Sequence, residues 1–158
     1  MRGAFASRVA LLSCLVLGLL GCAEEPSGPL ARVARWTGCA VPAGAVRVYD
    51  HLAGDARTFV MHAKVVLPKS RIGDFLSSCG FSVEELRRGY DPRAMAPREP
   101  LRWWNPPEPE WAAGAVRVDG DRRREILVVE RDTDFAVFLK ATGVAPYSTS
   151  QQRSSIDP

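Results

Sequence analysis

The sequence lacks the motifs that mark the common catalytic and nucleotide-binding sites. It contains no serine nucleophile elbow, no P-loop, no HExxH zinc motif and no glycine-rich nucleotide loop. Only two of its 158 residues are histidines, and none of its four cysteines forms a C-x-x-C pair. We therefore predict a protein that is not an enzyme and that binds no cofactor and no metal.

The chain also lacks an apolar run that is long enough to cross a membrane. The longest run begins at Val9 and ends at Leu20. It holds about twelve residues, whereas a transmembrane helix needs roughly 20. Arg2 and Arg8 form a basic segment with this run, and that combination is typical of a secretory signal peptide.

The apolar run closes on Leu19-Leu20-Gly21-Cys22 and gives way at once to acidic, proline and serine residues. This stretch resembles the lipobox of bacterial prolipoproteins. The resemblance implies that the Cys22 thiol receives a diacylglycerol, that cleavage occurs before Cys22, and that the new amino group can be acylated. Two or more acyl chains would anchor the protein stably. The alternative is an ordinary secretory signal with a chance cysteine. Cys14 lies inside the apolar run and is the weaker candidate for lipidation.

The resemblance also implies a location and a division of the chain. Ala23 stands where the family places an inner-membrane retention residue, which is usually Asp. The expected place is therefore the periplasmic side of the outer membrane in a Gram-negative cell, and otherwise the outer face of the cell membrane. The expected segments are a signal peptide at 1–21, the lipidated cysteine and a tether at 22–30, a single domain at 31–143 and a disordered, polar tail at 144–158.

Neither sign of charge dominates the chain that follows the cleavage site. The whole sequence has 21 basic and 18 acidic residues. Residues 1–21 include two arginines and no acid, so their removal leaves 19 basic and 18 acidic residues and a formal charge of +1. Because nucleic-acid-binding domains usually carry a marked basic excess, we expect no nucleic acid among the partners.

Two cysteines, Cys39 and Cys79, remain after cleavage and lipidation. An even pair in an exported protein predicts a disulfide. Two separate buried thiols are an alternative. A redox site is another, although redox pairs usually lie two residues apart and these lie forty apart.

Residues 45–52 and 57–67 predict a β-hairpin, because apolar and polar side chains alternate in both. Between them, Gly54 suits the first central position of a type II′ turn. The hydrophobic pattern and this turn agree on one register. The expected pairs are Val46 with Ala63, Arg47 with His62, and Val48 with Met61.

A helix is expected after the hairpin. Pro68 lies near its start and Gly80 lies past its end. Its apolar side chains recur at helical spacing, as in a core-facing stripe. The stripe consists of Ile72, Phe75, Leu76 and Cys79. A capping box at Ser82–Glu85 predicts a short second helix that ends at Gly89.

The last part of the domain predicts further strands. Strands are expected at 114–119, 124–131 and 134–140, and the continuous apolar run at 126–129 indicates a strand that is covered on both faces. The order of elements predicts an α+β domain with an antiparallel sheet of about five strands and one main helix packed on one face. The AGAVRV at 113–118 also repeats the AGAVRV at 43–48, by duplication of a hairpin or by chance.

The expected register separates the two histidines. His51 and His62 share the outward face of the hairpin, but His62 lies four positions along from the residue that faces His51. At about 3.3 Å per residue the separation is roughly 13 Å, which is too far for one metal ion. We therefore interpret His62 as part of a solvated polar face. We likewise interpret Arg122–Arg124 as a solvated turn, with contact to anionic lipid or another acidic surface as the alternative.

The most unusual segment runs from residue 91 to residue 110. It contains six prolines and follows neither the helical nor the strand period. Three of the four tryptophans, Trp103, Trp104 and Trp111, lie within nine residues here. Such aromatics in a stiff loop can form a binding platform for a sugar ring, a peptide or a partner protein. Alternatively, the indoles cover a sheet face that would otherwise be exposed.

These observations favour a non-catalytic, membrane-anchored envelope protein, and the chain is similar in outline to small bacterial lipoproteins of unknown function. Its expected partners are the membrane, through the lipid anchor, and an envelope protein or glycan. The residues of the expected binding surface are Arg47, Tyr49, His62, Trp103, Trp104 and Trp111. An immunity or inhibitor lipoprotein directed against an exported toxin or enzyme is the main alternative, and an envelope-acting enzyme is a further one.

Overall fold

The computed structural model describes residues 28–55 and 57–145. The expected signal peptide, the lipidated Cys22 and the greater part of the expected tail lie outside these residues. Single 3₁₀ turns lie at Val83–Glu85, Pro92–Met95 and Pro109–Trp111. The main elements are α1 (Pro29–Thr37), β1 (Arg47–Gly54), β2 (Thr58–Pro68), α2 (Ile72–Ser78), β3 (Arg87–Arg88), β4 (Ala113–Asp119), β5 (Arg122–Glu130) and β6 (Asp134–Val144).

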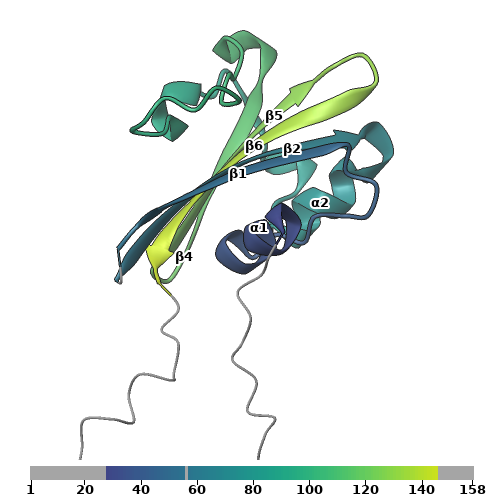
Figure 1. Ribbon diagram of the computed structural model, residues 1–158. Coiled ribbons are helices and arrows are strands. Elements are labelled where there is room, and N and C mark those ends of the chain that lie inside the picture. Colours follow the sequence, from purple (N-terminus) through teal and green to yellow (C-terminus); the bar gives the residue numbers. More distant parts are fainter. Residues whose placement is uncertain (1–27, 56, 146–158) are drawn as a thin grey trace, which may run out of the picture.

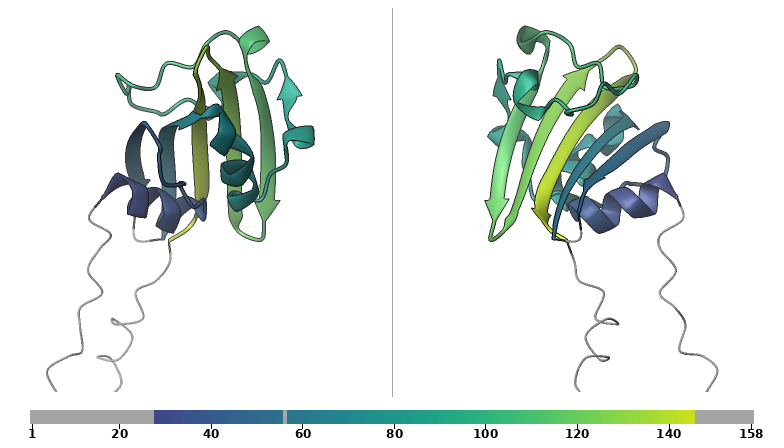
Figure 2. Two further views of the ribbon diagram at one scale, coloured as in Figure 1. Left: turned by 90° about the vertical axis from the view of Figure 1, so that its right-hand side faces the viewer. Right: turned by 60° about the vertical axis from the view of Figure 1, so that its left-hand side comes forward.

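The strands form one antiparallel sheet in the order β1-β2-β6-β5-β4-β3 (Figure 1). The predicted α+β class is confirmed, with six strands in place of about five and with two helices in place of one main helix. The strand expected at 134–140 extends to Val144, the first residue of the expected disordered tail. The sheet separates α1 and α2 on one side from the segment between β3 and β4 on the other (Figure 2).

The larger core lies between the sheet and the two helices. Strands β2, β5 and β6 contribute alternate side chains to it, and α2 contributes the expected stripe. Phe75, Leu76 and Cys79 of this stripe are buried, and Ile72 is partly buried. Because β5 is also apolar on its other face, the prediction of a strand covered on both sides is confirmed.

Helix α1 was not expected from the sequence. Pro29 occupies its first turn, and Gly38 ends it in the left-handed region at φ 76°. The fully buried residues of the helix are Val33 and Thr37 alone, one turn apart. Two such residues make a stripe too short to predict a helix. Pro29 and Leu30 of the expected tether belong to this helix.

The hairpin of β1 and β2 is confirmed, but its expected register is wrong by four residues. Arg47 lies opposite Val66, and not opposite His62. Strand β1 runs on through Gly54, and the chain turns at Asp55, whose carboxylate accepts hydrogen bonds from the backbone N–H groups of Arg57 and Thr58. An even shift preserves the face on which each side chain lies, so the hydrophobic pattern could not reveal it.

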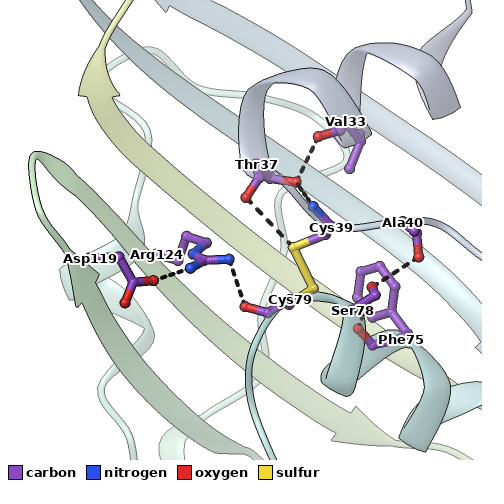
Figure 3. Close-up of a disulfide and its surroundings, with 9 residues drawn as sticks. All are labelled: Val33, Thr37, Cys39, Ala40, Phe75, Ser78, Cys79, Asp119 and Arg124. Carbon is purple, nitrogen blue, oxygen red and sulfur yellow. Dashed lines mark hydrogen bonds and ion pairs between the residues drawn. A yellow bond between two sulfur atoms is a disulfide. The ribbon is translucent and has the colours of Figure 1, made fainter.

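The predicted disulfide between Cys39 and Cys79 is present, and it joins the ends of α1 and α2 (Figure 3). Thr37 links the end of α1 to Cys39. Its hydroxyl donates to the carbonyl of Val33 at 2.6 Å and accepts from the N–H of Cys39 at 3.0 Å. The Ser78 hydroxyl donates to the carbonyl of Ala40 at 3.1 Å. The two helices are therefore fixed to each other as well as to the sheet.

The interpretation of Arg122–Arg124 as a solvated turn is wrong for Arg124. Only 14% of its side chain is exposed. Its guanidinium donates to the carbonyl of Cys79 at 2.8 Å and pairs with Asp119 (Figure 3). A cation at this carbonyl stabilises the C-terminal end of α2.

Two further expectations change. The Ser82–Glu85 capping box is present, but it opens a single 3₁₀ turn at Val83–Glu85 and not a helix that reaches Gly89. The two AGAVRV copies also differ in structure. The second lies wholly in β4, whereas in the first the chain turns at Gly44, with φ 94°, before β1 begins.

The disulfide closes a loop whose ends lie 40 residues apart, so its removal should cost about 4 kcal/mol by the chain-entropy model. We expect the Cys39→Ala/Cys79→Ala variant to lose about this much free energy of unfolding in urea at pH 7. A reducing agent should destabilise the wild type by a similar amount and leave the variant unchanged. Equal stability of the wild type and the variant would contradict a structural role for the bridge.

Candidate binding surface

The proline-rich segment between β3 and β4 covers the second face of the sheet (Figure 2). A second core lies beneath it, with Tyr90 and Trp104 packed at its margin. Its buried members are Met95, Ala112, Leu127, Val129, Ala136 and Phe138. The expectation that the indoles cover a sheet face is therefore confirmed for Trp104.

Three basic side chains of the sheet hold this segment in place. Lys140 donates to the carbonyl of Ala94 at 3.0 Å, and the His62 ring bonds the carbonyl of Met95 at 3.1 Å. Lys64 reaches further along the segment, to the carbonyl of Trp103 at 3.3 Å and the side-chain oxygen of Asn105 at 2.7 Å. We call these three residues the clamp. Because prolines have no N–H and form no regular backbone ladder, the carbonyls of the segment need donors from elsewhere.

The clamp positions a continuous row of aromatic rings. The Tyr49 and Trp103 rings stack at 5.8 Å between centroids, only 14° from parallel. Trp103 contacts Trp104 edge to face at 5.8 Å, and Trp104 contacts both His62 and Phe138 in the same manner at 5.1 and 5.3 Å. We call Tyr49, Trp103 and Trp104 the aromatic row. It leads from the edge strand β1 toward the centre of the sheet.

His62 is buried, at 4% exposure, so its interpretation as part of a solvated face is wrong. The true register also places it directly opposite His51, so the expected separation of roughly 13 Å is wrong as well. Within residues 28–55 and 57–145, no group of three or more potential metal-ligating side chains is present. Burial lowers the pKa of His62 to about 4, with a further contribution from the nearby charge of Lys140. The ring is therefore neutral at pH 7 and donates to Met95 from Nε2.

A buried carboxylate completes the polar layer beneath the segment. Glu125 is only 3% exposed and accepts hydrogen bonds from the Tyr90 hydroxyl at 2.8 Å and from Arg123 Nε at 3.0 Å. Lys140 Nζ lies 3.9 Å from the same carboxylate. Burial raises the pKa of Tyr90, and the hydrogen bond from its hydroxyl to Glu125 raises it further. Glu125 was not predicted from the sequence, although its position two residues before Leu127 places it on the same covered face.

The remaining expected site residues lie apart from one another. Arg47 is exposed on β1, two residues before Tyr49 and on the same face of the sheet. Trp111 is 71% exposed in the 3₁₀ turn before β4 and does not join the aromatic row. The structure therefore gathers Tyr49, His62, Trp103 and Trp104, with Arg47 beside them and Trp111 at a separate place.

A shallow hollow of about 200 Å³ lies apart from the aromatic row, between α1 and the turn that follows β1. Its lining includes Trp36, Leu52 and Phe59. Sites for drug-sized molecules usually measure about 300–1,000 Å³, so this hollow is smaller than a typical site of that kind.

Comparisons with known proteins matched this chain to no family model, no curated protein and no solved structure. Among the described residues, no helix has the length and apolar character needed to span a membrane.

The depressed pKa of His62 predicts how stability depends on pH. In the unfolded chain the ring takes up a proton near pH 6.5, whereas in the folded protein it does so only near pH 4. The unfolded state therefore binds more protons between these values, and the folded protein loses stability as the pH falls through this window. The loss assigned to His62 is about 2 kcal/mol between pH 7 and pH 5.

The measurement is urea unfolding of the wild type and His62→Gln at both pH values. The glutamine amide can still donate to Met95 but does not titrate. We expect the difference in unfolding free energy between the two proteins to shift by about 2 kcal/mol from pH 7 to pH 5, in favour of the variant. A constant difference would show that the ring titrates in the folded protein as it does in the unfolded chain.

Proposed function

We propose that this protein is a lipoprotein of the bacterial cell envelope, anchored through acyl chains on Cys22. We further propose that its domain binds an envelope protein or glycan and does not catalyse a reaction. Two observations support the export of the chain. The segment that ends at Gly21-Cys22 has the pattern of a lipobox, and the domain contains the Cys39–Cys79 disulfide, which is typical of oxidising compartments.

The observation that carries the binding proposal is the stacked pair of Tyr49 and Trp103. Both rings are partly exposed; Tyr49 lies on β1, and Trp103 lies on the segment whose backbone the clamp fixes. Large aromatic side chains that are already ordered contribute contact area at a low cost in conformational entropy. The exposed Arg47 and Asn105 lie beside them and supply charge and hydrogen-bonding groups. This combination suits a sugar ring or a peptide.

The surroundings of the row support a role without catalysis. A general acid or base has to reach its substrate and titrate near the working pH. His62 and Lys140 instead bond backbone carbonyls of the covering segment, and Glu125 is buried beneath Tyr90 and Arg123. These titratable side chains serve to attach the segment to the sheet.

The lipid anchor has a direct test. Intact-mass measurement of protein from its native host membranes should give a chain that begins at Cys22 and carries a diacylglycerol, with or without an N-acyl group. Cys22→Ala should remain uncleaved and retain Met1. Cys14→Ala serves as the matched control and should be processed as the wild type is. Soluble wild-type protein that begins with an unmodified Met1 would contradict the proposal.

The binding surface is tested by capture on purified peptidoglycan and by crosslinking to membrane proteins of the host. We expect Tyr49→Ala/Trp103→Ala to weaken the retained interaction at least about tenfold, as is usual when aromatic hot spots are truncated. Trp111→Ala removes an exposed tryptophan outside the row and should leave capture unchanged. Unfolding midpoints establish that each variant is folded.

The two ligand classes give different outcomes in this experiment. Retention on peptidoglycan identifies a glycan ligand, and a single crosslinked partner in fixed stoichiometry identifies a protein ligand. If the folded double variant is captured as well as the wild type, or if Trp111→Ala alone abolishes capture, the aromatic row is not the binding surface.

A further inference from the structure

The end of the domain nearest the proposed anchor differs from the end that carries the aromatic row. Helix α1, the turn after β1 and the turn between β4 and β5 form the lower boundary of the domain in Figures 1 and 2. The segment between β3 and β4 lies at the upper end in the same views. We call the lower boundary the anchor-side end. It comprises Pro29–Thr37, the residues that flank the β1–β2 turn, and the chain from Val118 to Arg124.

The length of the chain limits how far this end can lie from the bilayer. Gly28, the first described residue, lies six positions after Cys22. Even a fully extended chain of this length spans only about 20 Å. Electrostatic interactions with a membrane surface extend over about 8 Å at physiological ionic strength. An anchored domain can therefore come within reach of the headgroups, and the anchor-side end lies nearest to them.

The charge of this end is suited to an anionic surface. When the ion pairs Arg32–Asp50, Arg124–Asp119 and Arg123–Glu125 are set aside, the end retains three arginines and two aspartates, namely Arg35, Arg57, Arg122, Asp55 and Asp121. Helix α1 contains no acidic residue. Arg35 and Arg57 are exposed, and Arg122 is partly exposed. Arginines close to an anionic membrane are attracted to it, and they add to the effect of an acyl anchor.

The same end also exposes apolar side chains. Leu30 on the outer side of α1 is 50% exposed, and Leu52 near the end of β1 is 39% exposed. Val118 and Val144, at the ends of β4 and β6, are 61% and 42% exposed. Apolar side chains interspersed with basic ones are typical of surfaces that lie in the headgroup region of a bilayer.

We propose that the anchor-side end is a membrane-contact surface that binds anionic phospholipid. This inference rests on the proposed lipidation of Cys22. Contact at this end orients the domain so that the aromatic row faces away from the bilayer.

The test uses the acylated protein reconstituted into vesicles of phosphatidylcholine alone or of phosphatidylcholine with 30% phosphatidylglycerol. Amide hydrogen exchange is compared between the two. We expect amides of α1 and of the β4–β5 turn to exchange at least about threefold more slowly in the anionic vesicles. Amides of the segment between β3 and β4 should not change.

Charge-reversal variants provide the matched control. Arg35→Glu/Arg57→Glu should abolish the difference between the two vesicle types. Arg87→Glu/Arg88→Glu makes the same change of charge on β3, at the upper end, and should retain it. All variants keep Glu24 and Glu25 of the tether, so any change reports on the domain.

Each failure has a distinct signature. Absence of acyl groups by intact mass contradicts the proposed function before any vesicle is prepared. If the acylated protein shows the same exchange in both vesicle types, or if both double variants behave alike, the membrane-contact surface is wrong. Protection of α1 that appears in detergent and grows with protein concentration would identify a second copy of the chain as the occupant.

Discussion

The central strands β6 and β5 bury apolar side chains on both faces, and the rest of the domain follows from this constraint. Each face needs its own cover, because an exposed sheet face of this composition would promote association. The two helices cover one face and are joined at their ends by the disulfide. The other face has no α-helix in the described structure, and the proline-rich segment covers it instead.

A proline-rich cover poses a problem of hydrogen bonding that a helical cover does not. A helix satisfies most of its own backbone groups, whereas the carbonyls of an irregular segment need outside donors when they approach a buried surface. The sheet provides these donors through Lys64, Lys140 and His62. Such residues appear polar and surface-like in the sequence, although their role is to attach one layer of the protein to another.

The sequence predicted those parts of the fold that depend on local pattern. The five longer strands, the apolar stripe of α2 and the pairing of Cys39 with Cys79 all follow from periodicity or from the number of cysteines. Strand β3 was not predicted, because its two residues are too few to show a period and lie where a helix ending at Gly89 was expected. The register of β1 and β2 could not be predicted, because a shift of four residues leaves each side chain on the same face. His62 was misplaced for a related reason, since its burial depends on a segment more than thirty residues away in the chain.

The candidate surface was predicted in part. The cluster of tryptophans singled out the segment between β3 and β4 as a candidate, and the alternation in β1 placed Tyr49 on the outward face. The sequence could not show that Trp103 and Trp104 join Tyr49 in one row while Trp111 stands apart, because the path of an irregular loop leaves no periodic signal. Helix α1 was missed because only Val33 and Thr37 of its residues are buried.

Because β1 lies at the edge of the sheet, this surface can offer more interactions to one class of ligand than to another. An edge strand presents main-chain donors and acceptors on its outer side. A polypeptide that rests on Tyr49 can lengthen the sheet by one strand and so add backbone hydrogen bonds to its aromatic contacts. A saccharide at the same place interacts with side chains alone. The architecture thus offers a polypeptide ligand a second source of affinity that depends little on its sequence.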